Sequence, residues 1–468
     1  MSVGAAEAVP PSPAGDEDLV AVGEERLREY TIEACARVIR ERNAELSAVL
    51  TVLPEPARVV DAPANSPLGG VPYVLKDVWD TAGIRTTGGS FRHKARIPTE
   101  SARCYDVLSR SGAVLLGKSN LGDLAFSAES DNHIMGPVRN PLDLSRTAGG
   151  STGGGAAAVR AGMAAFDWGT DFGGSIRSPA AFCGLVGLRL SNETWPVESE
   201  HFPRISSHFW SWCGQGPITR SVAECAALIA AMRELCTRPR SFRAAPNDVV
   251  LYSPDKRHAG AWPGFTADAT RLLEGAGLDV DFSHGLPAPV RVNEIFAGYL
   301  CSHLEEMAGS EEMGIAEGLP IVLSGLATLG RLDKRMHPNT ALLFALMGVG
   351  RVTLYRSKKP WVAALAALRE SVLRIWSSGR LIVSPTTTLL APRHGRAAFT
   401  YGLQTFQKLG NMTDSTSIAI PFGVFEGAPH LPRSLLISGP PGSEDAVLAL
   451  AARLEARMEA RMDAQPAR

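Results

Sequence analysis

The sequence predicts an α/β protein in which helices cover a largely buried sheet. Apolar segments of strand length alternate with amphipathic helical segments along much of the chain. Hydrophobic residues make up 45% of the 468 residues and charged residues 20%, which is enough apolar material for a substantial core. No apolar run approaches the roughly 18 residues of a membrane-spanning helix.

The first half of the chain supplies several elements in order. Residues 1–20, rich in Ala, Pro and acidic residues, are expected to form a disordered tail. Apolar spacing predicts one amphipathic helix over residues 22–47. Residues 69–81 predict a buried strand that runs into a turn, and residues 101–120 predict a helix, a glycine turn and a strand. Residues 221–235 repeat apolar side chains every three to four positions, which predicts another helix.

The second half continues the alternation. The strand candidate "VVLYS" precedes the helix candidate "ADATRLLEGAG", and the strand candidates "RLIVSP", "SIAIP" and "SLLIS" precede the helix candidate "EDAVLALAARLEARM". Residues from about 255 to 375 are more helical and are interpreted as an inserted, pocket-forming wall. The sequence shows no internal repeat and no linker between separate domains. Residues 21–468 are therefore expected to form a single domain.

Charge and cysteine content exclude some classes of protein. The formal net charge is −1 and no basic block provides a footprint for phosphates, which argues against a nucleic-acid binder. The seven cysteines form no CxxC pair, which favours reduced thiols in a cytoplasmic protein. The N-terminus lacks the basic and apolar regions of a secretory signal, in agreement with a cytoplasmic location.

The glycine-rich stretch "TAGGSTGGGAAAVRAG", residues 147–162, allows four interpretations. A flexible linker is disfavoured because the stretch runs directly into a helical segment. A phosphate loop would need a following GK[ST], and a dinucleotide fold would need a central strand where the polar "NPLDLSRT" stands. The GxSxG match around Ser151 is typical of a nucleophile elbow, but we expect no strand before it.

The fourth interpretation joins Ser151 to two other residues as part of a catalytic apparatus. Ser175 lies in a second glycine turn, and Lys76 ends the apolar segment "GGVPYVLKD". A serine is a weak nucleophile until a base takes its proton. A lysine can serve as that base only where burial keeps it neutral. Taken alone, Lys76 would be a surface residue and Ser175 a helix N-cap.

At these residues the chain resembles the amidase signature family of serine hydrolases. Lys76-Asp77, "GGSTGGG" and "DFGGSIRSPAAFCG" match the family's motifs in order and spacing. The likeness covers residues 65–235 strongly and 380–460 weakly. It implies an amidase-signature fold, with a central mixed β-sheet covered by helices on both faces, and a reaction that needs no metal or organic cofactor.

The resemblance also implies a role for each motif residue. Ser175 would be the nucleophile, and Ser151, after a cis Gly150–Ser151 bond, would relay the proton to Lys76. The implied oxyanion hole consists of the backbone N–H groups of Phe172, Gly173, Gly174 and Ser175. The implied supporting residues are Thr152, Asp171 and Arg177, which we interpret as structural support for the turns rather than as chemical participants.

Two segments depart from the family's pattern. "RLSNETW" stands where a Lys-Pro-Thr segment is usual, and the loop 195–212 that follows it is rich in aromatic residues. That loop is either locally packed or an aromatic wall of the substrate pocket; its aromatic residues are Trp195, Phe202, Phe209, Trp210 and Trp212. "GNMTDSTSIAIP" is unusual at Asp414 and Thr416, which argues against a standard small amide and against a component of a tRNA amidotransferase.

The predicted function is the hydrolysis of a carboxylic amide, or an ester, with a small-molecule substrate and neither nucleic acid nor membrane as partner. Acyl transfer by the same triad, a non-catalytic binding protein and a homodimer stay open. The histidines at positions 133, 201 and 208 lack metal-ligand spacing, so we interpret them as packed or surface residues. Cys183 is expected to lie in the core, and "DFG" lacks the other kinase motifs.

Overall fold

A computed structural model gives the arrangement of most of the chain. It describes residues 16–57, 66–197, 201–204, 207–239, 242, 244, 247–282, 285–304, 306, 336–400 and 404–463.

The described residues form one central sheet of eleven strands, in the order β1-β3-β2-β6-β8-β7-β12-β13-β11-β9-β10. The strands are β1 Val49–Ala57, β2 Pro72–Lys76, β3 Val114–Ser119, β6 Phe166–Asp171, β7 Val186–Arg189, β8 Gly214–Thr219, β9 Asp248–Leu251, β10 Asp279–Asp281, β11 Leu381–Thr387, β12 Thr416–Phe425 and β13 Ala428–Gly439. Strand β2 pairs in parallel with β3 and β6, whereas β8 is antiparallel to both β6 and β7. The sheet is therefore mixed, as the resemblance implied.

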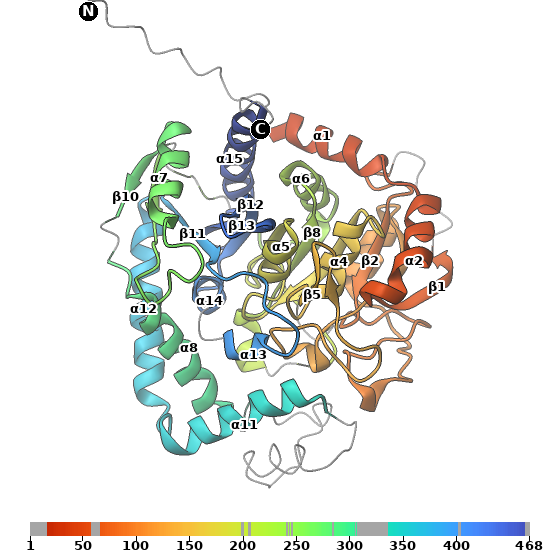
Figure 1. Ribbon diagram of the computed structural model, residues 1–468, viewed down its shortest axis with the longest axis horizontal. Helices are drawn as coiled ribbons and strands as arrows, with labels where there is room; N and C mark the ends of the chain where they lie inside the picture. Colours follow the sequence, from red (N-terminus) through yellow and green to blue (C-terminus); the bar gives the residue numbers. More distant parts are fainter. Residues whose placement is uncertain are drawn as a thin grey trace, which may run out of the picture.

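Helices surround this sheet (Figure 1). They are α1 Asp16–Arg28, α2 Ile32–Leu46, α3 Arg103–Arg110, α4 Gly153–Ala161, α5 Arg177–Cys183, α6 Val222–Ala231, α7 Phe265–Gly275, α8 Pro289–Ser302, α11 Pro338–Thr353, α12 Lys359–Ser377, α13 Ala397–Thr400, α14 Thr405–Met412 and α15 Glu444–Asp463. No helix within the described ranges is long and apolar enough to cross a membrane.

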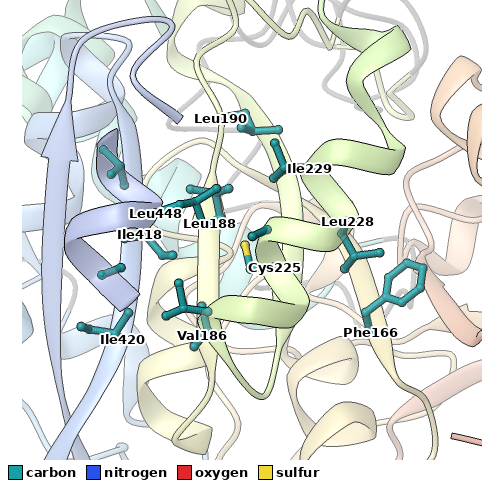
Figure 2. Packing of buried hydrophobic residues seen from close by; sticks show 14 of the residues in the cluster. Phe166, Val186, Leu188, Leu190, Cys225, Leu228, Ile229, Ile418, Ile420 and Leu448 are labelled. Atoms are coloured by element: carbon teal, nitrogen blue, oxygen red, sulfur yellow. The ribbon is translucent and has the colours of Figure 1, made fainter. Parts of the chain in front are cut away.

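Side-chain alternation in the strands shows that both faces of the sheet are covered. Tyr73 and Leu75 of β2 belong to a core that includes residues of α3, α6 and α15, whereas Val74 belongs to a core that includes residues of α2, α4 and α5. Figure 2 shows the first of these cores, where Leu228 and Ile229 of α6 lie close to side chains of the sheet. The prediction of helices on both faces is confirmed.

A third core lies at the other end of the sheet. Val250 of β9 and Ile382 of β11 pack with residues of α8, α11, α12 and α14. Their strand neighbours, such as Leu251 and Val383, face the first core instead. In Figure 1 the helices α8, α11 and α12 occupy the lower left of the molecule, beside the sheet. These helices fall in the segment 255–375, which also contributes β10, paired in parallel with β9. That segment is thus part of the sheet as well as a helical wall.

The N-terminal region differs from the expectation. The single helix predicted over residues 22–47 is two helices, because the hydroxyl of Thr31 accepts the N–H of Ala34 at 3.2 Å and starts α2. Helix α1 begins at Asp16, inside the segment predicted to be disordered, and residues 1–15 lie outside the described residues.

A short strand does precede the glycine-rich stretch, although none was expected there. Strand β5 (Asp143–Thr147) pairs with β4 (Arg139–Asn140) in a two-stranded ribbon outside the central sheet. The polar, proline-containing sequence is incompatible with a central strand, but it forms an edge ribbon without difficulty. A strand-to-helix passage through Ser151 therefore exists, although not from the central sheet as an elbow requires.

Candidate active site

Three chain segments bring the predicted residues to one edge of the sheet. Lys76 is the last residue of β2, and β6 runs parallel to β2 and ends at Asp171, just before the turn that holds Ser175. Ser151 lies in the turn between β5 and α4. In sheets of this kind sites form outside the carboxyl ends of parallel strands, and this is where the residues lie.

Lys76 is 0% exposed and makes three polar contacts. Its Nζ lies 2.9 Å from Ser151 Oγ, 3.1 Å from Thr170 O and 3.0 Å from Thr170 Oγ1. The protonated amine donates to all three oxygen atoms, whereas the neutral amine, with two N–H groups and one lone pair, would donate twice to Thr170 and accept from Ser151. Burial lowers the pKa of Lys76 to about 8, even though Asp167 acts in the opposite direction. The lysine is thus buried, but its nearest neighbours are polar groups rather than the apolar side chains that the sequence suggested.

Thr170 connects Lys76 to His201. Thr170 Oγ1 lies 3.3 Å from His201 Nε2, and His201 Nδ1 lies 2.9 Å from the carbonyl oxygen of Pro203. Because a carbonyl can only accept, we assign the ring proton to Nδ1, which leaves Nε2 to accept the Thr170 hydroxyl. Burial lowers the pKa of His201 to about 4, in keeping with a neutral ring. His201 was interpreted as a packed or surface residue, and it is packed in the interior. Its connection to Lys76 through Thr170 was not predicted.

The turn that carries Ser151 is closely surrounded. The Gly150–Ser151 peptide bond is cis, as the resemblance implied. A Cβ on Gly150 would lie 2.5 Å from both Ser127 O and Glu129 N, so only glycine fits. Ser130 Oγ donates to Ser151 O at 3.0 Å and accepts the N–H of Gly153 at 2.8 Å. Ser130 therefore fixes the turn from behind.

Ser175 faces the same small cavity as Ser151. The cavity has a volume of roughly 40 Å³, and both serines line it together with Thr170, Phe172 and His201. Ser175 is not a helix cap, because Ile176 holds the N-cap position of α5 and makes no side-chain capping bond. The backbone N–H of Thr152 donates to Ser175 O at 3.1 Å. Thr152 thus connects the two serine turns through its backbone.

The implied oxyanion hole needs one correction. The N–H of Gly174 donates to Asp171 Oδ1 at 2.8 Å, so it does not point toward a substrate. Phe172, Gly173 and Ser175 donate their backbone N–H groups to no other residue in the described part of the chain. Gly173 and Ser175 both line a second cavity of roughly 40 Å³ beside the serines. Of the four predicted donors, these three have N–H groups that no described residue accepts.

Asp171 and Arg177 form a buried pair behind the nucleophile turn. Arg177 Nε lies 2.9 Å from Asp171 Oδ2, and Nη2 lies 2.8 Å from Oδ1. Burial alone would raise the pKa of Asp171, but the Arg177 guanidinium holds it well below its usual range. Asn411 of α14 donates to both Asp171 Oδ1 and Trp212 O, at 2.9 Å each. The contacts match the structural role that we assigned to Asp171 and Arg177.

The aromatic residues of the loop 195–212 pack mainly behind the cavity. Trp195 is buried and donates to Glu444 at 3.0 Å, and the ring of Phe202 stacks under the Arg96 guanidinium. Phe209 and Trp212 contact Phe172 at centroid distances of 5.9 and 6.0 Å. The side chain of Trp210 lies outside the described residues. The loop instead contributes His201, Pro203 and Arg204 to the cavity lining, so its part of the wall is mostly not aromatic.

Asp414 joins the two segments that depart from the family's pattern. Its carboxylate accepts from Arg189 Nη2 at 3.0 Å and from the N–H groups of Asn192 and Glu193 at 2.8 and 2.9 Å. Asp414 lines neither small cavity at the serines. The unusual aspartate therefore fixes the unusual "RLSNETW" turn. This contact gives no support to the interpretation that Asp414 excludes a small amide.

The structure shows further polar residues that sequence reasoning missed. Besides Ser130 and Thr170, Asp167 is fully buried on β6, where its Oδ1 accepts from Ser119 Oγ at 2.7 Å. Burial raises the pKa of Asp167 to about 7, against the effect of Lys76. The sequence alone could have indicated that Asp167 is buried. It is an isolated acid in an apolar strand, one residue before Trp168, and such an acid faces the interior.

All seven cysteines are unpaired, and Cys183 is fully buried, as expected. Burial raises the pKa of Cys183 to about 12. Within the described ranges no group of three or more His, Cys, Asp or Glu side chains is arranged to hold a metal ion.

Comparisons with known proteins identify what the chain is similar to. A family model described as Amidase matches residues 29–259. Over 430 residues the chain is 30% identical to a glutamyl-tRNA(Gln) amidotransferase subunit from Carboxydothermus hydrogenoformans, covering 83% of each protein. It is 42% identical over 188 residues to the corresponding protein from Moorella thermoacetica, covering 38% of this chain and 37% of that one. In several curated relatives the match thus spans less than two thirds of their length.

A solved structure is similar to this chain over nearly its whole length. The crystal structure described as an amidase superimposes with a TM-score of 0.69 at 25% identity, covering 94% of this chain and 99% of that one. The likeness therefore extends beyond the motif region, to the segments that the sequence left unassigned.

Proposed function

Because the chain belongs to the amidase signature family, we propose that it hydrolyses a carboxylic amide through an acyl-enzyme on Ser175. Ser151 and Lys76 serve as the proton relay. The observation that carries the proposal is the buried amine of Lys76, which lies 2.9 Å from Ser151 Oγ and has its remaining contacts on Thr170. Burial lowers the pKa of Lys76 to about 8, so its neutral form, the base that a serine nucleophile requires, becomes the main form above that pH.

The first half of the reaction forms the acyl-enzyme. Ser175 Oγ attacks the amide carbon, its proton passes to Ser151, and the proton of Ser151 passes to Lys76 Nζ. The negative charge that develops on the carbonyl oxygen is stabilised by the backbone N–H groups of Phe172, Gly173 and Ser175. One such donor contributes about 2.7–4 kcal/mol to stabilising a transition state.

The second half releases both products. The proton on Lys76 returns through Ser151 to the leaving nitrogen, so that a neutral amine departs when the C–N bond breaks. Water then attacks the ester carbon and gives up a proton along the same relay. Ser175 Oγ recovers that proton, and the carboxylic acid leaves. The buried pair Asp171–Arg177 holds the turn in place throughout and exchanges no proton.

Three alternatives start from the same site. The curated relatives named above are amidotransferase subunits, which favours acyl transfer to an amine as the second candidate. An ester substrate would need the same groups. A non-catalytic binding role is disfavoured because Lys76, Ser151 and Ser175 are all present around one cavity edge.

The unpaired cysteines favour a cytoplasmic location for the enzyme.

A screen of amides that vary in acyl and amine bulk tests the proposal. Wild type is expected to release acid and amine from a subset, and Ser175→Ala is expected to release neither. Ser377→Ala, at an exposed position on α12, is the matched control and should keep wild-type rates. Turnover that persists in Ser175→Ala would contradict the assignment. Formation of a new amide when a second amine is added would favour the acyl-transfer alternative.

A further inference from the structure

The space at the two serines is too small for a whole substrate. Each of the two cavities that Ser175 lines has a volume of roughly 40 Å³. Ligand sites in proteins generally measure about 300–1,000 Å³. The cavities at Ser175 therefore accommodate the reacting group, and the remainder of the substrate must lie in adjoining space.

A much larger cavity adjoins this space. It has a volume of roughly 600 Å³ and lies among α8, α11 and α14. Leu343 of α11 lines both this cavity and the small cavity that contains Gly150, Gly173 and Ser175. The residues of the large cavity that matter for the argument are Phe296, Leu300, Leu343, Met347, Tyr355 and Lys408.

The wall of the large cavity is mostly apolar, with Lys408 set into it. The Lys408 side chain is only 2% exposed; its Nζ donates to Asn293 Oδ1 at 2.8 Å and lies 5.3 Å from the centre of the Phe296 ring. Burial lowers the pKa of Lys408 to about 7. A nearby anion would favour the protonated form of this amine and stabilise its buried charge, whereas a cationic ligand would be repelled by that form.

The other charged groups at this cavity do not cancel that preference. Arg257 adds a second positive charge to the lining. Glu294, which also lines the cavity, forms an ion pair with Arg291 at 2.9 Å. His258 is buried and bonded to Asp255 at 2.8 Å. Among these described residues, the positive groups inside the cavity are Lys408 and Arg257.

Helix α14 holds Lys408 in fixed relation to the nucleophile turn. The neighbouring residue, Gln407, accepts from Arg177 Nη1 through its carbonyl and donates from Nε2 to Ser178 Oγ, both at 2.9 Å. Arg177 and Ser178 closely follow Ser175, at the start of α5. A substrate that spans both cavities would therefore meet Ser175 and Lys408 at a constant separation.

We propose that the large cavity binds the end of the substrate remote from the scissile amide, and that this end is an apolar chain or ring bearing a carboxylate that Lys408 binds. The inference rests on the proposed amide hydrolysis and specifies its substrate class. The carboxylate belongs to either the acyl part or the leaving amine, and the experiment below separates these two sources.

Binding to Ser175→Ala provides a test that does not require turnover. One ligand series carries the carboxylate at the end of the acyl chain and a second carries it on the amine. Each ligand has a methyl-ended partner of equal length. Isothermal titration calorimetry is expected to show about 10- to 100-fold tighter binding of the carboxylate ligand in one series, as for a hydrogen bond to a charged group. The series that shows the difference identifies which side of the amide bears the charge.

Lys408→Met in the same background should remove that difference while leaving the methyl-ended partner unchanged. Lys359→Met, at an exposed position on α12, is the matched control. Lys408→Arg keeps the charge and should retain part of the preference, and thermal melting confirms that each variant is folded. Equal Kd values within every pair, or a preference that survives in Lys408→Met, would overturn the inference. A wild type that binds these ligands with the expected preference but hydrolyses no amide would instead refute the proposed function.

Discussion

The amine of Lys76 lies 2.9 Å from the hydroxyl oxygen of Ser151, and neither residue is more than 1% exposed. A buried amine that contacts a serine directly cannot exchange its proton freely with bulk water. In the proposed relay the Ser151 hydroxyl connects this amine to Ser175, with which it lines one cavity.

Replacing the base should abolish the reaction without unfolding the protein. Lys76→Met keeps the length and the apolar part of the side chain but cannot accept a proton. We expect kcat/KM for an amide substrate to fall by at least about 100-fold, the lower range for removing a general base. Steady-state kinetics measures the loss, and circular dichroism confirms the fold. Lys359→Met, on the surface, should be as active as wild type; a Lys76→Met enzyme with near-normal kcat/KM would refute the relay.

The pH profile should reveal the neutral form of Lys76. Because burial lowers its pKa to about 8, the amine accepts a proton only in the upper part of the accessible range. We expect kcat/KM to rise with pH and to level off above about pH 8, since this parameter reports groups of the free enzyme. A profile that is flat between pH 6 and about pH 9 would contradict the assignment of Lys76 as the base.

Asp167 should set the position of that rise. Its negative charge favours the protonated form of Lys76 and so raises the pKa of the amine. Asp167→Asn removes the charge but keeps an oxygen for Ser119, so the rising limb of kcat/KM should move to lower pH. Asp445→Asn, which changes an exposed carboxylate, should leave the limb in place. A limb that moves to higher pH in Asp167→Asn would show that the two groups interact in the opposite sense.

The buried pair Asp171–Arg177 should stabilise the fold strongly. Asp171→Asn leaves the guanidinium of Arg177 buried without a counter-charge, and such a change costs about 3–5 kcal/mol. Urea denaturation is expected to show a loss of this size in the free energy of unfolding. Asp445→Asn breaks the exposed pair with Arg233 and should cost no more than about 1 kcal/mol. Equal losses in the two variants would mean that the buried pair is not structural.

Gly150 should not tolerate even one added methyl group. A Cβ at this position would meet backbone atoms of residues 127 and 129 at 2.5 Å, and the turn holding Ser151 would have to move. We expect Gly150→Ala to lower both the melting temperature and the activity. Gly427→Ala, at an exposed turn where a Cβ meets no atom within 4 Å, is the matched control. Wild-type activity in Gly150→Ala would show that the tight packing around this turn is unimportant.

Much of the fold and of the site could be predicted from local patterns. The strands that hold Tyr73 and Leu115 are short apolar segments bounded by turn residues, so their type follows from the sequence itself. The motif residues Lys76, Ser151 and Ser175 carry the resemblance because each stands in a short local motif, a strand end for Lys76 and a glycine turn for each serine.

The parts that were missed depend on contacts between distant segments. Nothing near Thr170 in the sequence indicates that its hydroxyl lies 3.3 Å from His201, since a loop brings the histidine back to β6. The Gly174 N–H donates to Asp171 because of the conformation of the four-residue turn, and residue composition does not specify that conformation. Lys408 lies in an amphipathic helix, and only the packing of α8 against α14 shows that it is buried.

Identifying the residue that becomes covalently modified is the most direct test of the central claim. Wild-type enzyme treated with a fluorophosphonate probe should gain one adduct in intact-protein mass spectrometry, and peptide mapping should place it on Ser175. Ser175→Ala should gain none, although Ser151 remains. No adduct on the wild type, or an equal adduct on Ser175→Ala, would contradict the assignment of Ser175 as the nucleophile.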